Sequence, residues 1–148
     1  MQNKIAFIVG TLGIGGAERQ LYYICKLLLK SNYDIYIFTL IKGEYWEKEF
    51  IKLGISVKCF GKSKLKIKRF WDLFILLKTL SPDLIQSFHF YTNIYSSIIG
   101  RMLKIPSIGA IRSNFLSERE EFGKMKSYIS LKLSTYIFAN SLLAIQNY

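Results

Sequence analysis

The stretch Gly10-Thr11-Leu12-Gly13-Ile14-Gly15-Gly16-Ala17-Glu18-Arg19-Gln20 follows the apolar run 4–9 and precedes a segment with apolar residues at helical spacing. The run is typical of a buried strand, and residues 21, 24, 25 and 28 share one face of a helix. Four glycines within seven residues let the backbone turn sharply and approach a ligand closely. The helix that follows directs its free N–H groups back at this loop, so the order strand, glycine loop, helix predicts a ligand-facing turn.

The glycine loop also has a simpler interpretation as a tight connection between a strand and a helix. The dinucleotide pattern Gly-x-Gly-x-x-Gly, started at Gly10, fails at Leu12, and no Lys-Ser/Thr pair follows to make a nucleotide-triphosphate loop. The residues alone therefore leave the ligand of this loop open.

Strands and helices alternate along the rest of the chain. We predict strands at 34–40, 55–60, 84–88, 107–111 and 136–140. We predict helices at 46–53, 70–80, 93–104 and through 125–133. Ser117-Glu118-Arg119-Glu120 has the form of a capping box, and Ser141 is a candidate cap for one more helix.

This alternation predicts an α/β fold, a doubly wound Rossmann-like parallel sheet of about six strands in the order 3-2-1-4-5-6, with helices on both faces. Ligands of such sheets bind at the carboxyl ends of the strands, near the switch between strands one and four. The glycine loop leaves the first strand there, His89 leaves the fourth, and Arg112, Ser113 and Asn114 leave the fifth.

The composition is strongly basic, with a formal net charge of +11 over 148 residues. This balance favours a nucleic acid, an anionic membrane surface or a phosphorylated substrate as partner, although the codon bias of an AT-rich genome also raises the lysine content. Cys25 and Cys59 have no metal-binding spacing and are expected to be buried free thiols in a reducing compartment. The longest uncharged run, 84–100, is too polar to span a membrane.

Four stretches together resemble bacterial family 4 glycosyltransferases, which are retaining enzymes of the GT-B fold. Ile14-Gly15-Gly16-Ala17-Glu18-Arg19-Gln20-Leu21 resembles the family's Gly-Gly-Ala-Glu-Arg signature. The family's fourth strand is similar to Pro82-Asp83-Leu84-Ile85-Gln86-Ser87. The fifth strand of its polysaccharide-synthesis members is similar to Ile105-Pro106-Ser107-Ile108-Gly109-Ala110-Ile111-Arg112-Ser113. The ending of its sixth strand is similar to Ala139-Asn140-Ser141.

The resemblance implies that residues 1–148 form the N-terminal, acceptor-binding domain, with the C-terminal donor-binding domain absent. In the family that second domain supplies most nucleotide-sugar contacts, so we expect no transferase activity from this chain alone. The complete enzyme would use a nucleotide sugar as its substrate, with no cofactor and no metal, and a lipid-linked or polysaccharide acceptor. We expect a cytoplasmic protein, peripheral at the inner face of the membrane.

The resemblance also suggests roles for residues of the first helix and the fourth strand. Gly15 and Gly16 match the loop that approaches the donor diphosphate and the acceptor. Glu18 suits the helix dipole whatever the function, and Arg19 is expected either to hold a phosphate or to pair with a carboxylate. Family members carry a histidine just after the fourth strand that contacts the transferred sugar. Here Phe88 occupies that position, so His89 is a candidate catalytic residue with a structural role as the alternative.

Two further groups are candidates for binding anions. Arg112, with Ser113 and Asn114, is expected to face the cleft and bind a phosphate, or else Arg112 pairs with the acidic cluster 118–121. The basic residues of the run 62–69 could contact an anionic membrane, or form a solvated loop; they are Lys62, Lys64, Lys66, Lys68 and Arg69. A stand-alone nucleotide- or nucleic-acid-binding module is the alternative function, although no nucleic-acid recognition motif is present and we do not expect nucleic acid as the partner.

Overall fold

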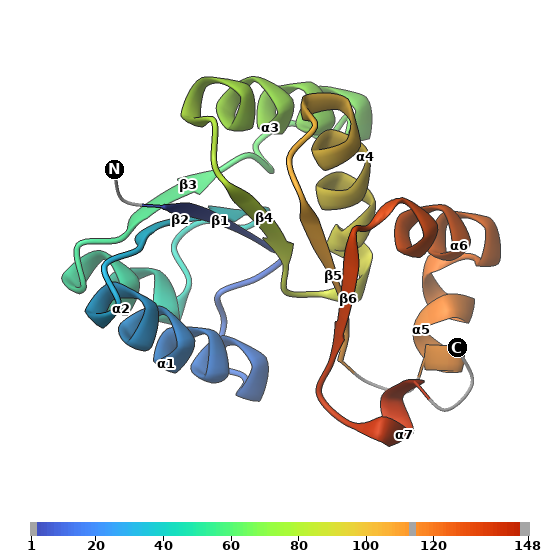
Figure 1. Ribbon diagram of the computed structural model, residues 1–148, viewed down its shortest axis with the longest axis horizontal. Helices are drawn as coiled ribbons and strands as arrows, with labels where there is room; N and C mark the ends of the chain where they lie inside the picture. The colour runs from blue at the N-terminus through green and yellow to red at the C-terminus, as the bar shows by residue number, and fades with distance from the viewer. Residues whose placement is uncertain (1–2, 113–114, 146–148) are drawn as a thin grey trace.

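The computed structural model describes residues 3–112 and 115–145 and contains one six-stranded sheet. Its strands are β1 (Lys4–Val9), β2 (Asp34–Thr39), β3 (Ser56–Cys59), β4 (Leu84–Ser87), β5 (Ser107–Ile111) and β6 (Tyr136–Ala139). Every neighbouring pair is parallel, and the order is β3-β2-β1-β4-β5-β6 (Figure 1). The predicted fold class and strand order are confirmed.

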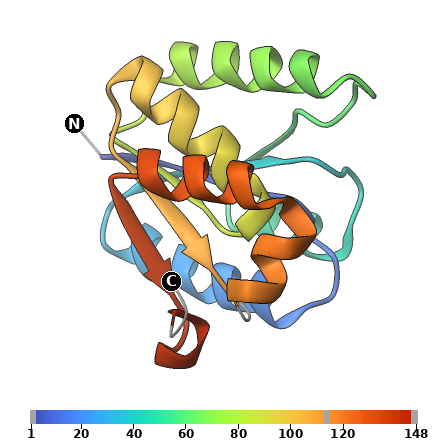
Figure 2. The same ribbon diagram turned by 90° about the vertical axis from the view of Figure 1, so that its right-hand side faces the viewer.

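Helices cover both faces of the sheet (Figure 1). They are α1 (Gly16–Lys30), α2 (Tyr45–Lys52), α3 (Lys66–Leu80), α4 (Asn93–Leu103), α5 (Phe115–Phe122), α6 (Lys124–Leu133) and α7 (Leu142–Ile145), with a 3₁₀ turn at Phe90–Thr92. The first two lie on one face and α3 and α4 on the other, while α6 packs beside α4 towards the β6 edge (Figure 2).

The core has two layers because the central strand β1 is buried on both sides. Phe7 and Val9 pack with Leu21 of α1 on one face of the sheet. Ala6 and Ile8 pack on the other face in the cluster that includes Leu73 of α3. A strand buried on both faces has no polar side to alternate with, which explains the uninterrupted apolar run in the sequence.

Helix starts differ from the predictions by more than one residue at two places. The predicted helix 70–80 begins at Lys66 instead, so half of the basic run belongs to the first turns of α3. Ser117 lies inside α5, which begins at Phe115, so the predicted capping box is wrong; a turn at Gly123 then separates α5 from α6. The predicted cap at Ser141 is confirmed, since its hydroxyl accepts a hydrogen bond from the Ala144 amide at 3.2 Å.

None of the helices in the described part of the chain is long and apolar enough to cross a membrane. Within residues 3–112 and 115–145, moreover, no group of three or more His, Cys, Asp or Glu side chains could hold a metal ion.

Candidate functional site

The chain leaves β1 and β4 side by side at the carboxyl edge of the sheet. Ile8 is paired with Ser87, so Gly10 and His89 each lie two residues beyond a paired position. Two hydroxyls fix the backbone at this point: Ser87 Oγ and Thr92 Oγ1 lie 2.9 and 2.8 Å from the His89 carbonyl oxygen. The local turn therefore directs the His89 side chain towards the glycine loop.

His89 contacts both ends of the glycine loop. The Gly10 amide donates a hydrogen bond to Nδ1 at 3.1 Å, and Nε2 lies 3.1 Å from Oε1 of Glu18. Both side chains are largely buried, with 14% of His89 and 8% of Glu18 exposed. Burial lowers the pKa of His89 below its usual value, against the opposing attraction of the Glu18 carboxylate.

Tyr91 completes this end of the loop. Its ring stacks on that of His89 with centroids 5.5 Å apart and an angle of 23° between the planes. A Cβ on Gly10 would lie 1.8 Å from the Tyr91 hydroxyl oxygen, so this position tolerates only glycine while Tyr91 stays in place. Burial raises the pKa of Tyr91, and the nearby carboxylates of Glu18 and Glu44 act in the same direction.

Glu44, which the sequence analysis missed, holds the middle of the loop. Its Oε1 accepts a hydrogen bond from the Thr11 hydroxyl at 2.6 Å, and its Oε2 accepts one from the Leu12 amide. Glu44 precedes α2 in the connection after β2. The sequence does offer a signal for Glu44. Because β2 lies beside β1 in the predicted strand order, an acidic residue in the connection after β2 is expected near the glycine loop that follows β1.

Arg112, at the end of β5, lies against α1 and not against the acidic cluster. Its Nη2 donates to Gln20 Oε1 at 2.6 Å, and its guanidinium lies 4.3 Å from the centre of the Phe88 ring. Its Nε and Nη1 are buried without a hydrogen-bond partner in the described part of the chain. Burial lowers the pKa of Arg112, although Glu18 and Glu118 attract the cation. Both nitrogens thus lack a protein partner there but are closed off from solvent, so a ligand would reach them only if the side chain moved.

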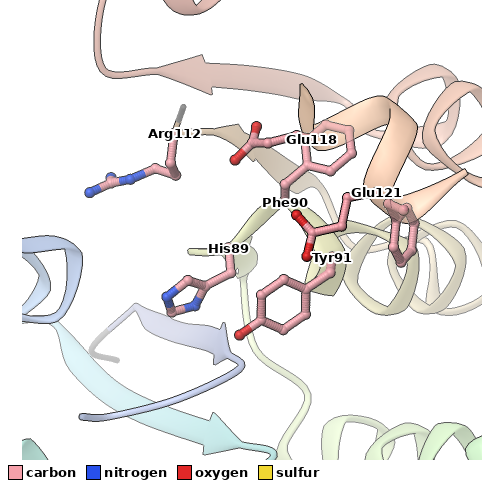
Figure 3. Close-up of a pocket in the computed structure, with 7 residues that line it drawn as sticks. His89, Phe90, Tyr91, Arg112, Glu118 and Glu121 are labelled. Atoms are coloured by element: carbon pink, nitrogen blue, oxygen red, sulfur yellow. The ribbon is translucent and has the colours of Figure 1, made fainter. Parts of the chain in front are cut away.

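A pocket of about 300 Å³ opens beside these residues. Its lining comes from the end of β4, the end of β5 and α5, and consists of His89, Phe90, Tyr91, Arg112, Glu118, Glu121 and Phe122 (Figure 3). In the close-up the Arg112 side chain extends away from Glu118 and Glu121. Aromatic rings and carboxylates therefore meet in one concave site, and Arg112 borders it with its guanidinium directed away from the two carboxylates.

The other predicted site residues are placed differently. Gly15 and Gly16 form the start of α1, and a Cβ at Gly16 would meet nothing within 4 Å. Arg19 is exposed, whereas Glu18 is buried against His89. Ser113 and Asn114 lie outside the described residues. The basic run 62–69 lies away from the pocket, around the start of α3.

Comparison with known families and proteins gives a consistent pattern. The family model described as Glycosyltransferase Family 4 matches residues 14–145. A curated protein of Campylobacter jejuni, GalNAc-alpha-(1->4)-GalNAc-alpha-(1->3)-diNAcBac-PP-undecaprenol alpha-1,4-N-acetyl-D-galactosaminyltransferase, is 31% identical over 150 residues. This match covers 94% of the chain but only 39% of that relative, so the chain spans about two fifths of its length.

Solved structures share the fold at lower identity. HepE of Anabaena in complex with UDP-glucose superposes with a TM-score of 0.75 at 19% identity, over 97% of this chain and 39% of that one. The lipopolysaccharide outer core galactosyltransferase WaaB superposes with a TM-score of 0.73 at 18% identity, over 97% of this chain and 41% of that one. UDP-GlcNAc 2-epimerase of Methanocaldococcus jannaschii has a TM-score of 0.65 at 18% identity, again over 97% of this chain and over 41% of that one. Because transferase and epimerase both superpose, the fold alone does not specify the reaction.

Proposed function

This chain belongs to glycosyltransferase family 4, and from that premise we propose that it is the acceptor-binding half of a retaining glycosyltransferase. The complete enzyme would move a sugar from a nucleotide-sugar donor to a lipid-linked or polysaccharide acceptor. The Campylobacter jejuni relative is named for an acceptor on undecaprenol diphosphate, which supports an acceptor of that class. The chain spans 39% of that relative, and on this ground we propose that it is inactive alone.

The pocket at the carboxyl edge is the observation that carries this proposal. Phe90, Tyr91 and Phe122 offer apolar ring faces, and Glu118 and Glu121 offer carboxylates that accept hydrogen bonds from hydroxyl groups. A largely apolar cavity with a few polar groups that fix orientation is the usual form of a small-molecule site. A sugar ring has both a C–H face and a rim of hydroxyls, and it matches this lining.

Arg112 supplies the group suited to a phosphate. The fork of a guanidinium group binds phosphate oxygens in pairs. Nε and Nη1 have no protein partner in the described residues but are closed off from solvent, so a phosphate would engage them only after the side chain turns outward. Gln20 and the Phe88 ring hold the cation in place. The contact of His89 with the transferred sugar stays a prediction, as do those of Gly15, Gly16, Arg19, Ser113 and Asn114 with substrate.

A calorimetric binding screen of the pure chain tests the proposal. The ligands are a short-chain polyprenyl diphosphate sugar, UDP-glucose, UDP-N-acetylglucosamine and a mixed-sequence oligonucleotide. We expect the polyprenyl diphosphate sugar to bind best, and Arg112→Gln to weaken it about tenfold or more through the lost charged hydrogen bonds. Arg101→Gln is the matched control, because Arg101 is exposed on α4 at the opposite edge of the sheet.

Two other results would replace the proposal. Nucleotide binding without acceptor binding would make the chain a stand-alone nucleotide-binding module. Preference for the oligonucleotide, with equal effects of Arg112→Gln and Arg101→Gln, would make it a nucleic-acid-binding module held by overall charge.

The partner surface proposed for the complete enzyme is an anionic membrane, contacted through α3. Lys62, Lys64, Lys66 and Lys68 are exposed, whereas Arg69 is half-buried and donates from Nε to the Ser63 carbonyl oxygen. Ile67 lies between two of these lysines, and Trp71 and Ile75 follow it at four-residue spacing; the three side chains are 64%, 47% and 59% exposed.

The outer face of α3 thus combines an apolar stripe with a basic end. The opposite face is buried through Leu73 and Leu77. A basic amphipathic helix of this kind lies in the plane of a membrane interface. The α3 N-terminus follows β3 and so lies at the carboxyl edge of the sheet, the same edge as the pocket. A membrane contact there would bring a lipid-linked acceptor to the side of the domain that carries the site.

A further inference from the structure

His89 connects two segments that the glycine loop separates in sequence. Gly10 is the first residue after β1, and Glu18 lies in the first turn of α1. One imidazole ring reaches both, through Nδ1 to the Gly10 amide and through Nε2 to Glu18 Oε1, each at 3.1 Å. We propose that His89 is a positioning residue that clamps the two ends of the glycine loop, as the neutral tautomer with its hydrogen on Nε2.

The tautomer follows from the partners. A backbone amide only donates, so Nδ1 must present its lone pair to Gly10, and the ring hydrogen must then be on Nε2. Nε2–H faces the carboxylate of Glu18, which accepts. A second proton on Nδ1 would set an N–H group against the Gly10 N–H and break that end of the clamp.

The surroundings of the ring favour the neutral form on balance. Burial opposes the charged form, and Arg112 at the end of β5 acts in the same direction. Glu18 on α1 and Glu44 after β2 oppose this effect, and the Tyr91 ring stacks on the imidazole. Since the pKa of His89 is lowered in the folded protein, the unfolded chain binds more protons between about pH 6.5 and the lowered value. The contribution of neutral His89 to stability is therefore fully present above about pH 6.5 and is lost as the pH falls through the lowered pKa, where the ring gains its second proton and the clamp opens.

The clamp has a consequence that rests on the proposed function. Glu44 holds Thr11 and Leu12 in the middle of the loop, and His89 holds its two ends. The loop then keeps one shape beside the pocket before any ligand arrives. A sugar hydroxyl would reach a ring nitrogen only by displacing Gly10 or Glu18, so His89 would act on a substrate through the loop.

The first test uses nitrogen NMR of the isolated chain, in which His89 is the single histidine. Its ring therefore gives one set of signals that needs no assignment. We expect the Nε2–H pattern at pH 7.5 and a titration midpoint below 6.5, with the Gly10 amide shifting at the same midpoint. An Nδ1–H pattern, or a midpoint at or above 6.5, overturns the proposal.

The second test uses two variants that each keep one half of the clamp. The amide of His89→Asn lies close to the position of Nδ1, and that of His89→Gln close to the position of Nε2. Hydrogen exchange at Gly10 should remain slow in His89→Asn and become about tenfold faster in His89→Gln and His89→Ala, as for the loss of one hydrogen bond.

The exchange of the Phe7 amide in the central strand reports on global folding and should be unchanged in all three variants. Equal acceleration at Gly10 in His89→Asn and His89→Ala, with Phe7 still protected, overturns the proposal. These measurements involve no sugar or lipid, so their outcome is independent of whether the acceptor-binding function holds.

Discussion

Changing Lys62, Lys64, Lys66 and Lys68 together to Gln should remove most of the affinity of the chain for anionic membranes. Each Lys close to an anionic leaflet contributes about 1 kcal/mol. Arg69 is excluded because it is half-buried and bonded to Ser63, so four exposed lysines remain. Their sum of about 4 kcal/mol corresponds to close to three orders of magnitude in affinity as an upper bound. Ordering of the long side chains reduces this value, and we expect at least a tenfold loss.

The apolar stripe should contribute separately. Trp71 is 47% exposed. A tryptophan side chain has roughly 200 Å² of surface to bury, so inserting the exposed part of Trp71 into the membrane would remove about 90 Å² from water. At about 25 cal/mol per Å² this gives about 2 kcal/mol, or more than tenfold in affinity. Trp71→Gln should therefore weaken binding even at high salt, whereas the effect of the lysines should disappear as the Debye length falls from about 10 Å at 0.1 M to about 3 Å at 1 M.

Vesicle co-sedimentation at both salt concentrations, with anionic and with neutral lipids, measures these effects. The matched control carries Lys104, Lys124, Lys126 and Lys132 changed to Gln, which removes the same charge from exposed positions just after α4 and on α6. Thermal melting of each variant excludes unfolding, since Trp71 also packs edge-on against Phe70 and Phe74. Equal losses in the two quadruple variants would show that overall charge and not α3 attracts the membrane, and failure of the unmodified chain to bind would refute the surface altogether.

Three further predictions concern activity and stability. The pure chain should turn over no nucleotide sugar in a radiolabel transfer assay, and transfer by a preparation free of other enzymes would contradict this. Asn93→Asp should lower the free energy of unfolding in urea by about 1–3 kcal/mol. Asn93 donates a hydrogen bond to the Ala110 carbonyl at 2.9 Å and accepts one from the Ala110 amide at 2.8 Å, and a carboxylate cannot donate. An unchanged unfolding midpoint would contradict this prediction. Gly61→Ala should also destabilise, since its Cβ would lie 1.8 Å from the Leu40 carbonyl oxygen, whereas Gly16→Ala, with open space around it, should leave the midpoint unchanged or raise it.

The sheet could be predicted from the sequence because its signals are local. β1 and β5 have the predicted bounds, since each apolar run is bordered by a charged residue, a proline or a glycine. The strand order then follows from alternation of strands and helices with right-handed crossovers. Where the local signal is missing, the prediction is wrong. The residue before α3 is Leu65, which forms no side-chain cap, so nothing in the basic run marks the helix start at Lys66.

The site was less predictable because its contacts join residues far apart in the chain. Gly10 and His89 are 79 positions apart, and Leu12 and Glu44 are 32 apart. The adjacency of β1 and β4 could be predicted, but their register could not, and it is the register that places Gly10 opposite His89. The sequence therefore identifies the glycine loop and His89 as separate candidates, and only the structure shows the hydrogen bond between Gly10 and His89.

The distribution of charge changes the meaning of the high net charge. Around the loop and the pocket, the described acidic side chains are Glu18, Glu44, Glu118 and Glu121, and Arg112 is the cation that lines the pocket. The immediate site is thus not basic, although the whole chain carries +11. Charges more than about 10 Å away are largely screened at 0.1 M salt, so distant lysines cannot hold a phosphate in this pocket. An anionic group bound there depends on Arg112, while the exposed lysines at the start of α3 act on whatever surface the domain approaches.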